Sequence, residues 1–255
     1  MILVFGGTTE GKQVIKLLDG LQIPYFYSTK TEIKVTLGST GIYRFGAFSN
    51  AVLAQFIKEH QIEYCIHASH PFATVLHETV AEEFEKQHLS VLRLEREYPK
   101  RSTSNGVHYV ANYSEAILLL ETSFSKKTLL GLTGVQTIEK LEHYWETNPS
   151  YFRILDRKSS IDIAVKSNYP LAQLILGYAN TTVEEEVTLY IDKKIGVILT
   201  KESGNSGSLQ VKIDAAKELN LPIIIIKKPD LPRYFKSVKC IEELESLLKT
   251  NTLCP

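Results

Sequence analysis

Short runs of continuous apolar residues alternate with amphipathic segments along most of this chain. Residues 2–5 form the first apolar run, and residues 12–18 behind it have helical periodicity. One face of the helix predicted over residues 50–59 collects apolar side chains, namely Val52, Leu53, Phe56 and Ile57. Continuous apolar strands that alternate with helices are typical of parallel sheets covered on both faces. The alternation therefore predicts an α/β fold, with two Rossmann-like domains, mainly parallel sheets and a cleft between them.

The same pattern gives expected bounds for the elements. Strands are predicted at residues 2–5, 23–28, 64–68, 90–97, 128–134, 151–155, 171–177, 195–204 and 222–228. Helices are predicted at residues 12–18, 50–59, 71–87, 135–146, 160–168, 182–193, 209–219 and 241–249. Two short β-like pieces, residues 33–38 and 42–46, are expected to form a hairpin or an excursion from the sheet.

A polar segment rich in turn-forming residues, YPKRSTSNG at 98–106, interrupts the alternation. It divides the chain into a predicted N-terminal Rossmann-like domain, residues 1–106, and a predicted C-terminal one, residues 107–255. Ligands of open α/β sheets bind beyond the carboxyl ends of the strands. The polar loops at those ends are therefore the candidate sites.

Composition argues against several classes of function. The chain has 29 Lys and Arg and 29 Asp and Glu, so its net charge is zero and no global field attracts nucleic acid. Its longest apolar run, residues 222–226, is too short to span a membrane, and no basic leader precedes the first strand. The isolated cysteines Cys65, Cys240 and Cys254 form neither a disulfide framework nor a zinc motif. We expect a cytoplasmic protein without nucleic-acid or membrane partners.

The first strand runs into the turn GGTTEGKQ. Gly6, Gly11 and Lys12 fit a P-loop, but Gln13 lacks the hydroxyl that would hold Mg²⁺. Thr8 stands where the dinucleotide fingerprint has its middle glycine. A buried strand, a tight turn and a helix start still favour an anion through backbone N–H groups, although an ordinary β–α turn has the same shape. The candidate cofactor-binding residues of this turn are Gly6, Gly7, Thr8, Thr9, Glu10 and Gly11.

The second strand leads into Thr29 and Lys30, which are also candidate cofactor-binding residues. NADH-binding folds place a carboxylate near this position to hold the ribose. A cation here favours a 2′-phosphate and hence NADPH, while the nearby Glu32 leaves NADH open. Lys30 is equally consistent with a solvated surface lysine.

Four further loops follow strand ends. The segment HASHPFA offers Ser69 and His70 near the start of a helix, with Pro71 in its first turn. His67, His70 and His77 lack a fourth neighbouring ligand, so we expect no metal. The loops LERE, GLTG and TKESG place polar side chains at the same edge, namely Arg96, Thr133, Lys201 and Ser203. Each loop also has an ordinary structural interpretation as an ion pair, a cap or a turn.

Taken together, these loops resemble the precorrin-6A reductase family of corrin biosynthesis over nearly the whole chain. The resemblance rests on ILVFGGTTEGKQV, HASHPFA, LRLERE, LLGLTG, FRIL, VILTKESGNSG and AAKELNLPIIIIKKP, in that order. The chain departs from the family pattern at His67, where an acidic residue is usual, at Gly177-Tyr178-Ala179, where Gly-Pro-Phe is usual, and at Gly207-Ser208, where Gly-Gly is usual.

The resemblance implies an oxidoreductase that passes a hydride from NADPH, or from NADH, to a tetrapyrrole, either precorrin-6A or its cobalt-bearing form. His70 and Lys201 are the candidate catalytic residues. The candidate substrate-binding residues are Ser69, Arg96, Thr133, Arg153 and Ser203. The alternative is a non-redox nucleotide-binding protein or NTPase that uses residues 6–12. The oligomeric state stays open.

Overall fold

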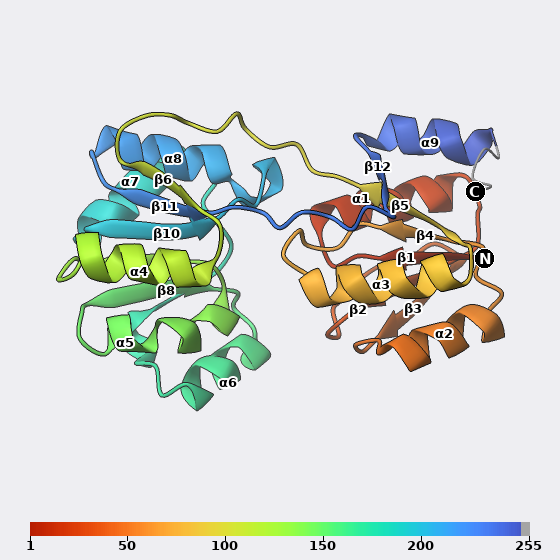
Figure 1. Cartoon of the computed structure of the whole chain (residues 1–255), viewed down its shortest axis with the longest axis horizontal. Coiled ribbons are helices and arrows are strands. Elements are labelled where there is room, and N and C mark those ends of the chain that lie inside the picture. Colours follow the sequence, from red (N-terminus) through yellow and green to blue (C-terminus); the bar gives the residue numbers. More distant parts are fainter. Residues whose placement is uncertain (251–255) are drawn as a thin grey trace. The chain divides into compact units, whose positions relative to one another are not determined.

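The computed structural model describes residues 1–250 and divides into two compact units (Figure 1). The first unit contains Met1–Glu97 together with the chain from Pro229 on, and the second contains Tyr98–Lys228. This division differs from the expected one at residue 106 in two respects. The segment 98–106 belongs to the second unit, and the last strand and helix return to the first. The return follows from strand pairing, because Lys236–Val238 extends the first sheet beside Ser90–Leu94.

The first sheet has six strands in the order β12-β5-β4-β1-β2-β3, and all its pairings are parallel. Its strands are β1 (Ile2–Phe5), β2 (Tyr25–Thr29), β3 (Gly41–Phe45), β4 (Tyr64–His67), β5 (Ser90–Leu94) and β12 (Lys236–Val238). The chain runs outward from β1 through β2 and β3, then returns to place β4 and β5 on the other side. The order therefore reverses between β1 and β4.

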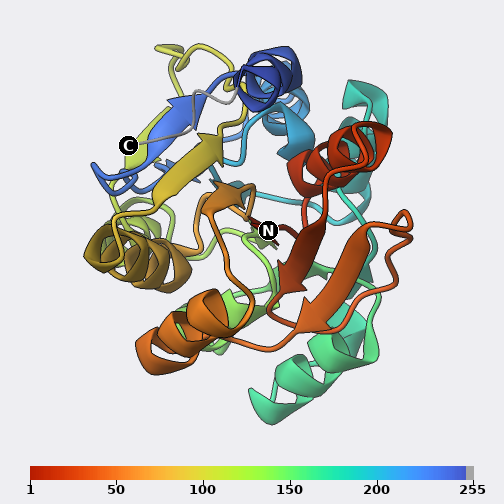
Figure 2. The same ribbon diagram turned by 90° about the vertical axis from the view of Figure 1, so that its right-hand side faces the viewer.

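Helices cover both faces of this sheet (Figure 2). The helices are α1 (Thr9–Gly20), α2 (Asn50–Glu59), α3 (Thr74–Lys86) and α9 (Ile241–Lys249). On one face, α1 and α9 bury residues such as Leu18 and Leu244 against β1 and β2. On the other, α2 and α3 bury residues such as Leu53 and Phe84. The helices thus leave the carboxyl edge of the sheet to the loops.

The second sheet also has six parallel strands, in the order β6-β11-β10-β7-β8-β9. They are β6 (Val107–Val110), β7 (Leu129–Leu132), β8 (Ser150–Ile154), β9 (Leu174–Leu176), β10 (Val197–Lys201) and β11 (Ile223–Ile226). Here the strand order reverses between β7 and β10.

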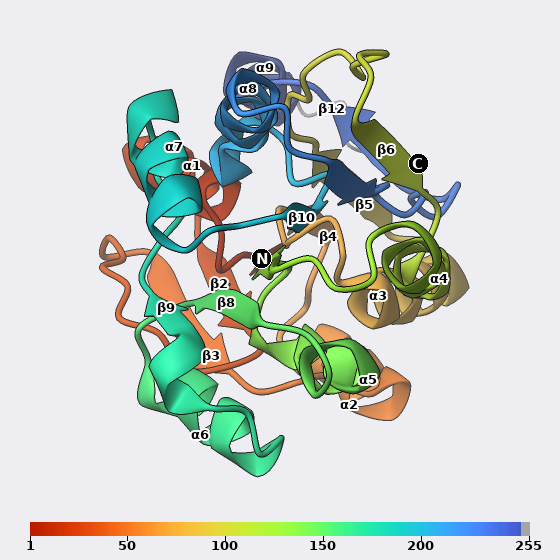
Figure 3. The ribbon, with the colours of Figure 1, turned by 90° about the vertical axis from the view of Figure 1, so that its left-hand side faces the viewer.

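The second unit also has helices on both faces of its sheet (Figure 3). They are α4 (Tyr113–Ser123), α5 (Glu142–Trp145), α6 (Lys158–Lys166), α7 (Val183–Asp192) and α8 (Leu209–Glu218). Single 3₁₀ turns, η1 (Val135–Thr137), η2 (Glu139–Leu141), η3 (Leu171–Gln173) and η4 (Asn205–Gly207), lie in the loops. The apolar core under α7 and α8 includes Tyr190, Leu209 and Ile213.

Several expected elements differ in the structure. Residues 33–38 form no strand, because polar side chains satisfy their backbone: Ile33 N–H donates to the Tyr43 hydroxyl, and Gly38 N–H to Asp19. The helix expected over 135–146 is broken into η1, η2 and α5. Here the Trp145 indole donates a hydrogen bond to the Ile138 carbonyl, and the Thr137 hydroxyl donates one to the Gly134 carbonyl, so side chains compete with the helical hydrogen bonds. The helix expected from residue 71 begins at Thr74. The elements β6, α4 and β12 had not been predicted.

Two of the cysteines lie in the described part of the chain, Cys65 buried and Cys240 exposed, and Cys254 lies outside it. Among residues 1–250, no helix combines the length and the apolar character needed to cross a bilayer.

Candidate functional site

Two predicted loops meet where the strand order of the first sheet reverses. The glycine turn follows β1, and the turn HASHPFA follows β4. The Thr8 hydroxyl of the first turn donates to the Ala68 carbonyl of the second at 2.6 Å. A reversal of strand order opens a crevice at the carboxyl edge of an α/β sheet, which is the usual place for a ligand.

The glycine turn is packed against β2 on one side. Gly6 N–H donates to the Ser28 carbonyl at 3.0 Å, and Gly7 N–H donates to the Tyr27 hydroxyl at 2.8 Å. A Cβ on Gly6 would lie 2.2 Å from the Tyr27 ring, and Gly7 has a φ of 86°. The turn therefore requires glycine at both positions, for space at Gly6 and for backbone conformation at Gly7.

Thr8 caps α1 and leaves two amides for a ligand. Its hydroxyl accepts from Gly11 N–H at 3.0 Å while donating to the β4 turn, so its one proton is already used inside the protein. Within residues 1–250, the N–H groups of Thr8 and Thr9 have no acceptor. Two open amides at the positive end of a helix dipole form an anion-binding arrangement.

A pocket of about 370 Å³ opens beside this turn. We call it the first-unit pocket, and its walls include Gly6, Thr29, Lys30, Phe48, Ser69 and His70. Because Gly6 belongs to its wall, the side of the glycine turn away from Tyr27 is accessible. The carboxyl ends of β1, β2 and β4 all contribute to the pocket, together with the start of α3.

One cation lines the first-unit pocket, and a second contacts residues of its wall. Lys30 is exposed in the wall, and its contact to a phosphate stays a prediction. Arg44 had not been predicted. Its Nη1 donates to the Ser28 hydroxyl at 2.7 Å, and its guanidinium carbon lies 3.7 Å from the centroid of the Phe48 ring. Burial lowers the pKa of Arg44, and the ring face offsets part of that cost by attracting the cation.

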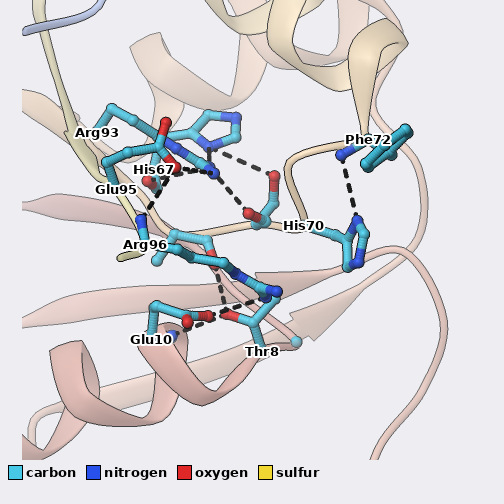
Figure 4. A network of polar contacts seen from close by, with 12 residues as sticks. Thr8, Glu10, His67, His70, Phe72, Arg93, Glu95 and Arg96 are labelled. Carbon is cyan, nitrogen blue, oxygen red and sulfur yellow. Dashed lines mark hydrogen bonds and ion pairs between the residues drawn. The ribbon is translucent and has the colours of Figure 1, made fainter. Parts of the chain in front are cut away.

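The turn after β4 is held by a buried arginine (Figure 4). Arg93, on the neighbouring strand β5, donates to Nδ1 of His67 at 3.0 Å and to the Ser69 carbonyl at 2.9 Å. Its side chain is only 1 % exposed. A guanidinium satisfied by a loop carbonyl fixes that loop, so Arg93 determines where Ser69 and the following residue lie.

Neither Ser69 nor His70 caps α3, contrary to expectation, because the helix begins three residues beyond Pro71, with Ala73 as its N-cap residue. His70 is exposed in the wall of the first-unit pocket, and its Nδ1 accepts from Phe72 N–H at 3.2 Å (Figure 4). An Nδ1 that accepts places the proton of the neutral ring on Nε2. The neutral His70 ring can therefore donate a hydrogen bond through Nε2.

Arg96 and Glu10 contact each other. The Nη2 of Arg96 lies 3.0 Å from a carboxylate oxygen of Glu10, and both side chains are buried (Figure 4). Arg96 had been expected to bind a substrate carboxylate and Glu10 a cofactor. The pair instead ties the segment after β5 to the first turn of α1 and neutralises a carboxylate beside the glycine turn.

The second sheet brings Thr133 and Lys201 to the ends of adjacent strands. Thr133 follows β7 directly, and Lys201 is the last residue of β10; the register of the two strands pairs Leu132 with Thr200. The Thr133 hydroxyl lies 2.6 Å from that of Thr137. Burial, and then the charge of Lys140, lower the pKa of Lys201 to about 8.

Arg153 meets a carboxylate of the protein itself. Its two terminal nitrogens lie 2.5 and 3.1 Å from the two oxygens of Glu186, which is fully buried. Lys212 lies near this pair and donates to the Gly207 carbonyl at 2.7 Å. Arg153 thus forms an internal ion pair, and its contact to substrate stays a prediction.

The lysine of the apparent P-loop lies outside the first-unit pocket. Lys12 of the apparent P-loop lies within α1 and lines a different depression, with Lys16, Asp19 and Lys34. A phosphate at the glycine turn would not have this lysine beside it in the first-unit pocket.

In the described part of the chain, no group of three or more His, Cys, Asp or Glu side chains is placed to hold a metal ion.

A sequence model of one protein family matches residues 1–250, and its description is "Precorrin-6x reductase CbiJ/CobK". The chain is 28 % identical to a precorrin-6A reductase of Rhodococcus erythropolis, over 91 % of this chain and 90 % of that protein. It is 29 % identical to a cobalt-precorrin-6A reductase of Priestia megaterium, over 88 % of this chain and 84 % of that protein. These relatives carry names for both the metal-free and the cobalt-bearing substrate.

A solved structure of a CobK precorrin-6A reductase superimposes with a TM-score of 0.81 at 21 % sequence identity. The match covers all of this chain and 98 % of the other. At this identity the likeness concerns the fold, and it agrees with the two parallel α/β units described above.

Proposed function

The chain belongs to the precorrin-6x reductase family CbiJ/CobK, a family of oxidoreductases, and we propose that it reduces precorrin-6A or its cobalt-bearing form by hydride transfer from NADPH. The family model and the curated relatives support a precorrin-6A reductase role in cobalamin biosynthesis. The observation that carries the cofactor assignment is the pair of open amides at the glycine turn beside the first-unit pocket. We place the protein in the cytoplasm in this proposal, as expected for a biosynthetic enzyme.

The diphosphate of the dinucleotide fits the N-terminus of α1. The amides of Thr8 and Thr9 supply two donors, and the helix dipole favours the negative charge. Arg96 offsets the charge of Glu10, which would otherwise repel an anion from this position. Gly6 and Gly11 allow the close packing of turn, helix and strand, and Gly7 supplies the positive φ of the turn.

Lys30 in the wall of the first-unit pocket, with Arg44 behind that wall, favours NADPH over NADH. A 2′-phosphate near the end of β2 would meet Lys30, with Arg44 behind Ser28. Among the described residues that line the pocket, none is the aspartate or glutamate that would hold a free ribose 2′-hydroxyl. Thr29 supports this wall, because its hydroxyl is 2.8 Å from the Tyr43 hydroxyl and bonds the Thr31 carbonyl.

The nicotinamide supplies the hydride when the dinucleotide is bound, so the protein groups need only hold, orient and protonate. His70 is our candidate proton donor in its cationic form, in which Nδ1 is also protonated and no longer accepts from Phe72 N–H. Ser69 is fixed beside it by Arg93. In the second unit, Thr133, Lys201 and Ser203 are the proposed contacts to the tetrapyrrole.

The test uses the purified chain with NADPH and with each substrate, metal-free and cobalt-bearing. We expect the reduced-nicotinamide absorbance to fall only when substrate is present. NADPH labelled with deuterium at C4 of the nicotinamide should transfer the label to the product. No turnover with either substrate, or product without label, would contradict the proposal.

Calorimetry with NADPH and with ATP–Mg separates the reductase from a nucleotide-binding protein that uses residues 6–12. We expect binding of NADPH and none of ATP–Mg. Binding of ATP–Mg alone would reverse the assignment.

A further inference from the structure

The second unit has its own reversal of strand order, between β7 and β10. Thr133, which follows β7, and Lys201, the last residue of β10, are therefore at the carboxyl edge where open α/β sheets bind ligands. The same edge also receives the start of α4 and the turn η2, since both follow strands of this sheet.

Two ammonium groups share one aromatic ring at this edge. The Nζ of Lys140, in η2, lies 4.9 Å from the centroid of the Tyr113 ring. The Nζ of Lys201 lies 5.7 Å from the same centroid. Tyr113 is the first residue of α4. Burial raises the pKa of its phenol, so the ring stays neutral and contributes its face and not a charge.

The two lysines repel each other. The charge of Lys140 is one cause of the lowered pKa of Lys201, after burial. The acidic residue next to Lys201 in sequence, Glu202, is used elsewhere. Its carboxylate accepts two hydrogen bonds from Arg101, at 2.8 and 3.0 Å, and one from Lys228 N–H at 2.9 Å. A carboxylate supplied by a ligand would relieve the repulsion between the lysines.

The loop beside Lys201 is preorganised. Lys212 holds the Gly207 carbonyl at 2.7 Å, and Ser208 has a φ of 52° at the start of α8. Lys212 is in turn near the Arg153–Glu186 pair. A fixed loop lowers the entropy cost of binding at this edge.

We propose that Lys140, Lys201 and the Tyr113 ring form a carboxylate-binding subsite that holds an acidic side chain on the rim of the tetrapyrrole. This inference rests on the proposed function and adds a named subsite to it. The open amides at α1 already provide for the diphosphate of the dinucleotide, so the anion that remains for the second unit is a substrate carboxylate. The ring face also suits the apolar edge of a macrocycle.

Uroporphyrin, a stable tetrapyrrole with a carboxylate on every rim side chain, serves as the probe, and its binding is followed by its own fluorescence. We expect Lys140→Gln and Lys201→Gln each to raise its Kd about tenfold, and Lys201→Arg to stay within about threefold of the unsubstituted chain, because the charge is kept. Kd for NADPH should not change in any of these variants. KM for the natural substrate should rise in the same order.

Lys193→Gln is the matched control. Lys193 also lies over an aromatic ring, with its Nζ 5.2 Å from the centroid of Tyr151, but it follows the C-terminal end of α7. This variant removes the same charge from the second unit and should bind uroporphyrin like the unsubstituted chain. Circular dichroism and thermal unfolding check that each variant is folded.

Three outcomes would overturn the subsite. The first is no binding of uroporphyrin by the unsubstituted chain, and the second is an equal loss in Lys193→Gln and Lys201→Gln. The third is a loss of NADPH or inorganic diphosphate binding in the lysine variants, which would assign the cluster to the dinucleotide. Failure of the proposed function is distinguishable, because it would appear as absent NADPH oxidation in the unsubstituted chain.

Discussion

Arg93 donates a hydrogen bond of 3.0 Å to Nδ1 of His67, and both side chains are buried in the first unit. Since a guanidinium only donates, Nδ1 of His67 accepts and the ring carries its proton on Nε2. The His77 ring lies edge-on to that of His67, with centroids 5.0 Å apart. Burial, together with the charge of Arg93, thus keeps two neighbouring imidazoles neutral.

This arrangement predicts acid sensitivity. Burial, and then the charge of Arg93, lower the pKa of His77 from 6.5 to about 4, and the same causes hold that of His67 well below its usual range. The unfolded chain therefore binds more protons below about pH 6.5, and the free energy of unfolding falls as the pH drops from about 6.5 to about 4. At about pH 5, His77 alone should lower it by about 2 kcal/mol.

Urea unfolding at about pH 7 and about pH 5 measures this effect. Between the two pH values, the free energy of unfolding should fall less in His77→Leu than in the unsubstituted chain. Some fall should remain in the variant, because His67 is still present. His143→Leu, at an exposed position of the second unit, is the control and should keep the full dependence. An equal loss in His77→Leu and the unsubstituted chain would contradict the account.

Gly6→Ala tests the packing of the glycine turn. The new Cβ would lie 2.2 Å from the Tyr27 ring, so the ring or the turn must move. We expect a loss of about 1–3 kcal/mol in the free energy of unfolding, with loss of NADPH binding. Gly20→Ala is the matched control, because a Cβ there meets nothing within 4 Å and Gly20 lies in α1. It should leave binding unchanged and stabilise slightly.

Lys30→Gln tests the preference for a 2′-phosphate. KM for NADPH should rise about tenfold while KM for NADH stays the same, because only NADPH has the extra charge. Arg44→Gln should act in the same direction and also lower stability, since the guanidinium packs on Phe48. Lys12→Gln removes an exposed charge outside the first-unit pocket and should change neither KM. Equal losses for both nucleotides would argue against this role of Lys30.

Arg153→Met tests whether that residue is structural. Removing one partner of a buried pair leaves Glu186 without its hydrogen-bonded partner and should cost about 3–5 kcal/mol in the free energy of unfolding. Arg153→Met combined with Glu186→Leu should recover part of this loss. If the Arg153→Met variant is fully stable and has a raised KM for substrate, this structural role is wrong, and the direct substrate contact predicted from the sequence is supported.

The sequence predicted the parallel α/β architecture because most strands are continuous apolar runs buried on both faces. It did not reveal β12, since Lys236 and Ser237 are exposed and the strand pairs only along one edge. The return of the chain to the first unit depends on that pairing and has no local signal. The helix expected over 135–146 fails for a local reason, because the Trp145 indole donates to the Ile138 carbonyl and the Thr137 hydroxyl donates to the Gly134 carbonyl just before it.

The candidate site was predicted in part. The loops after β1 and β4 could be named because turn residues follow apolar strands, and the topology brings them together. Arg44 and Lys140 could not be predicted as site residues, because neither lies in a recognisable motif. Each is distinguished by its contact with an aromatic ring, and that contact depends on the tertiary structure. Arg93 did carry a signal, as a charged residue within the apolar run VLRL. Arg96 and Arg153 were chosen as ligand contacts because of their charge. The sequence did not show that each forms an ion pair with a carboxylate of the protein, Glu10 and Glu186 respectively.

A crystal structure with NADP⁺ bound tests the central claim most directly. The account predicts diphosphate oxygens within about 3.2 Å of the Thr8 and Thr9 amide nitrogens, with the 2′-phosphate at Lys30 in the first-unit pocket. A dinucleotide bound in another place, with the glycine turn free of phosphate, would contradict it.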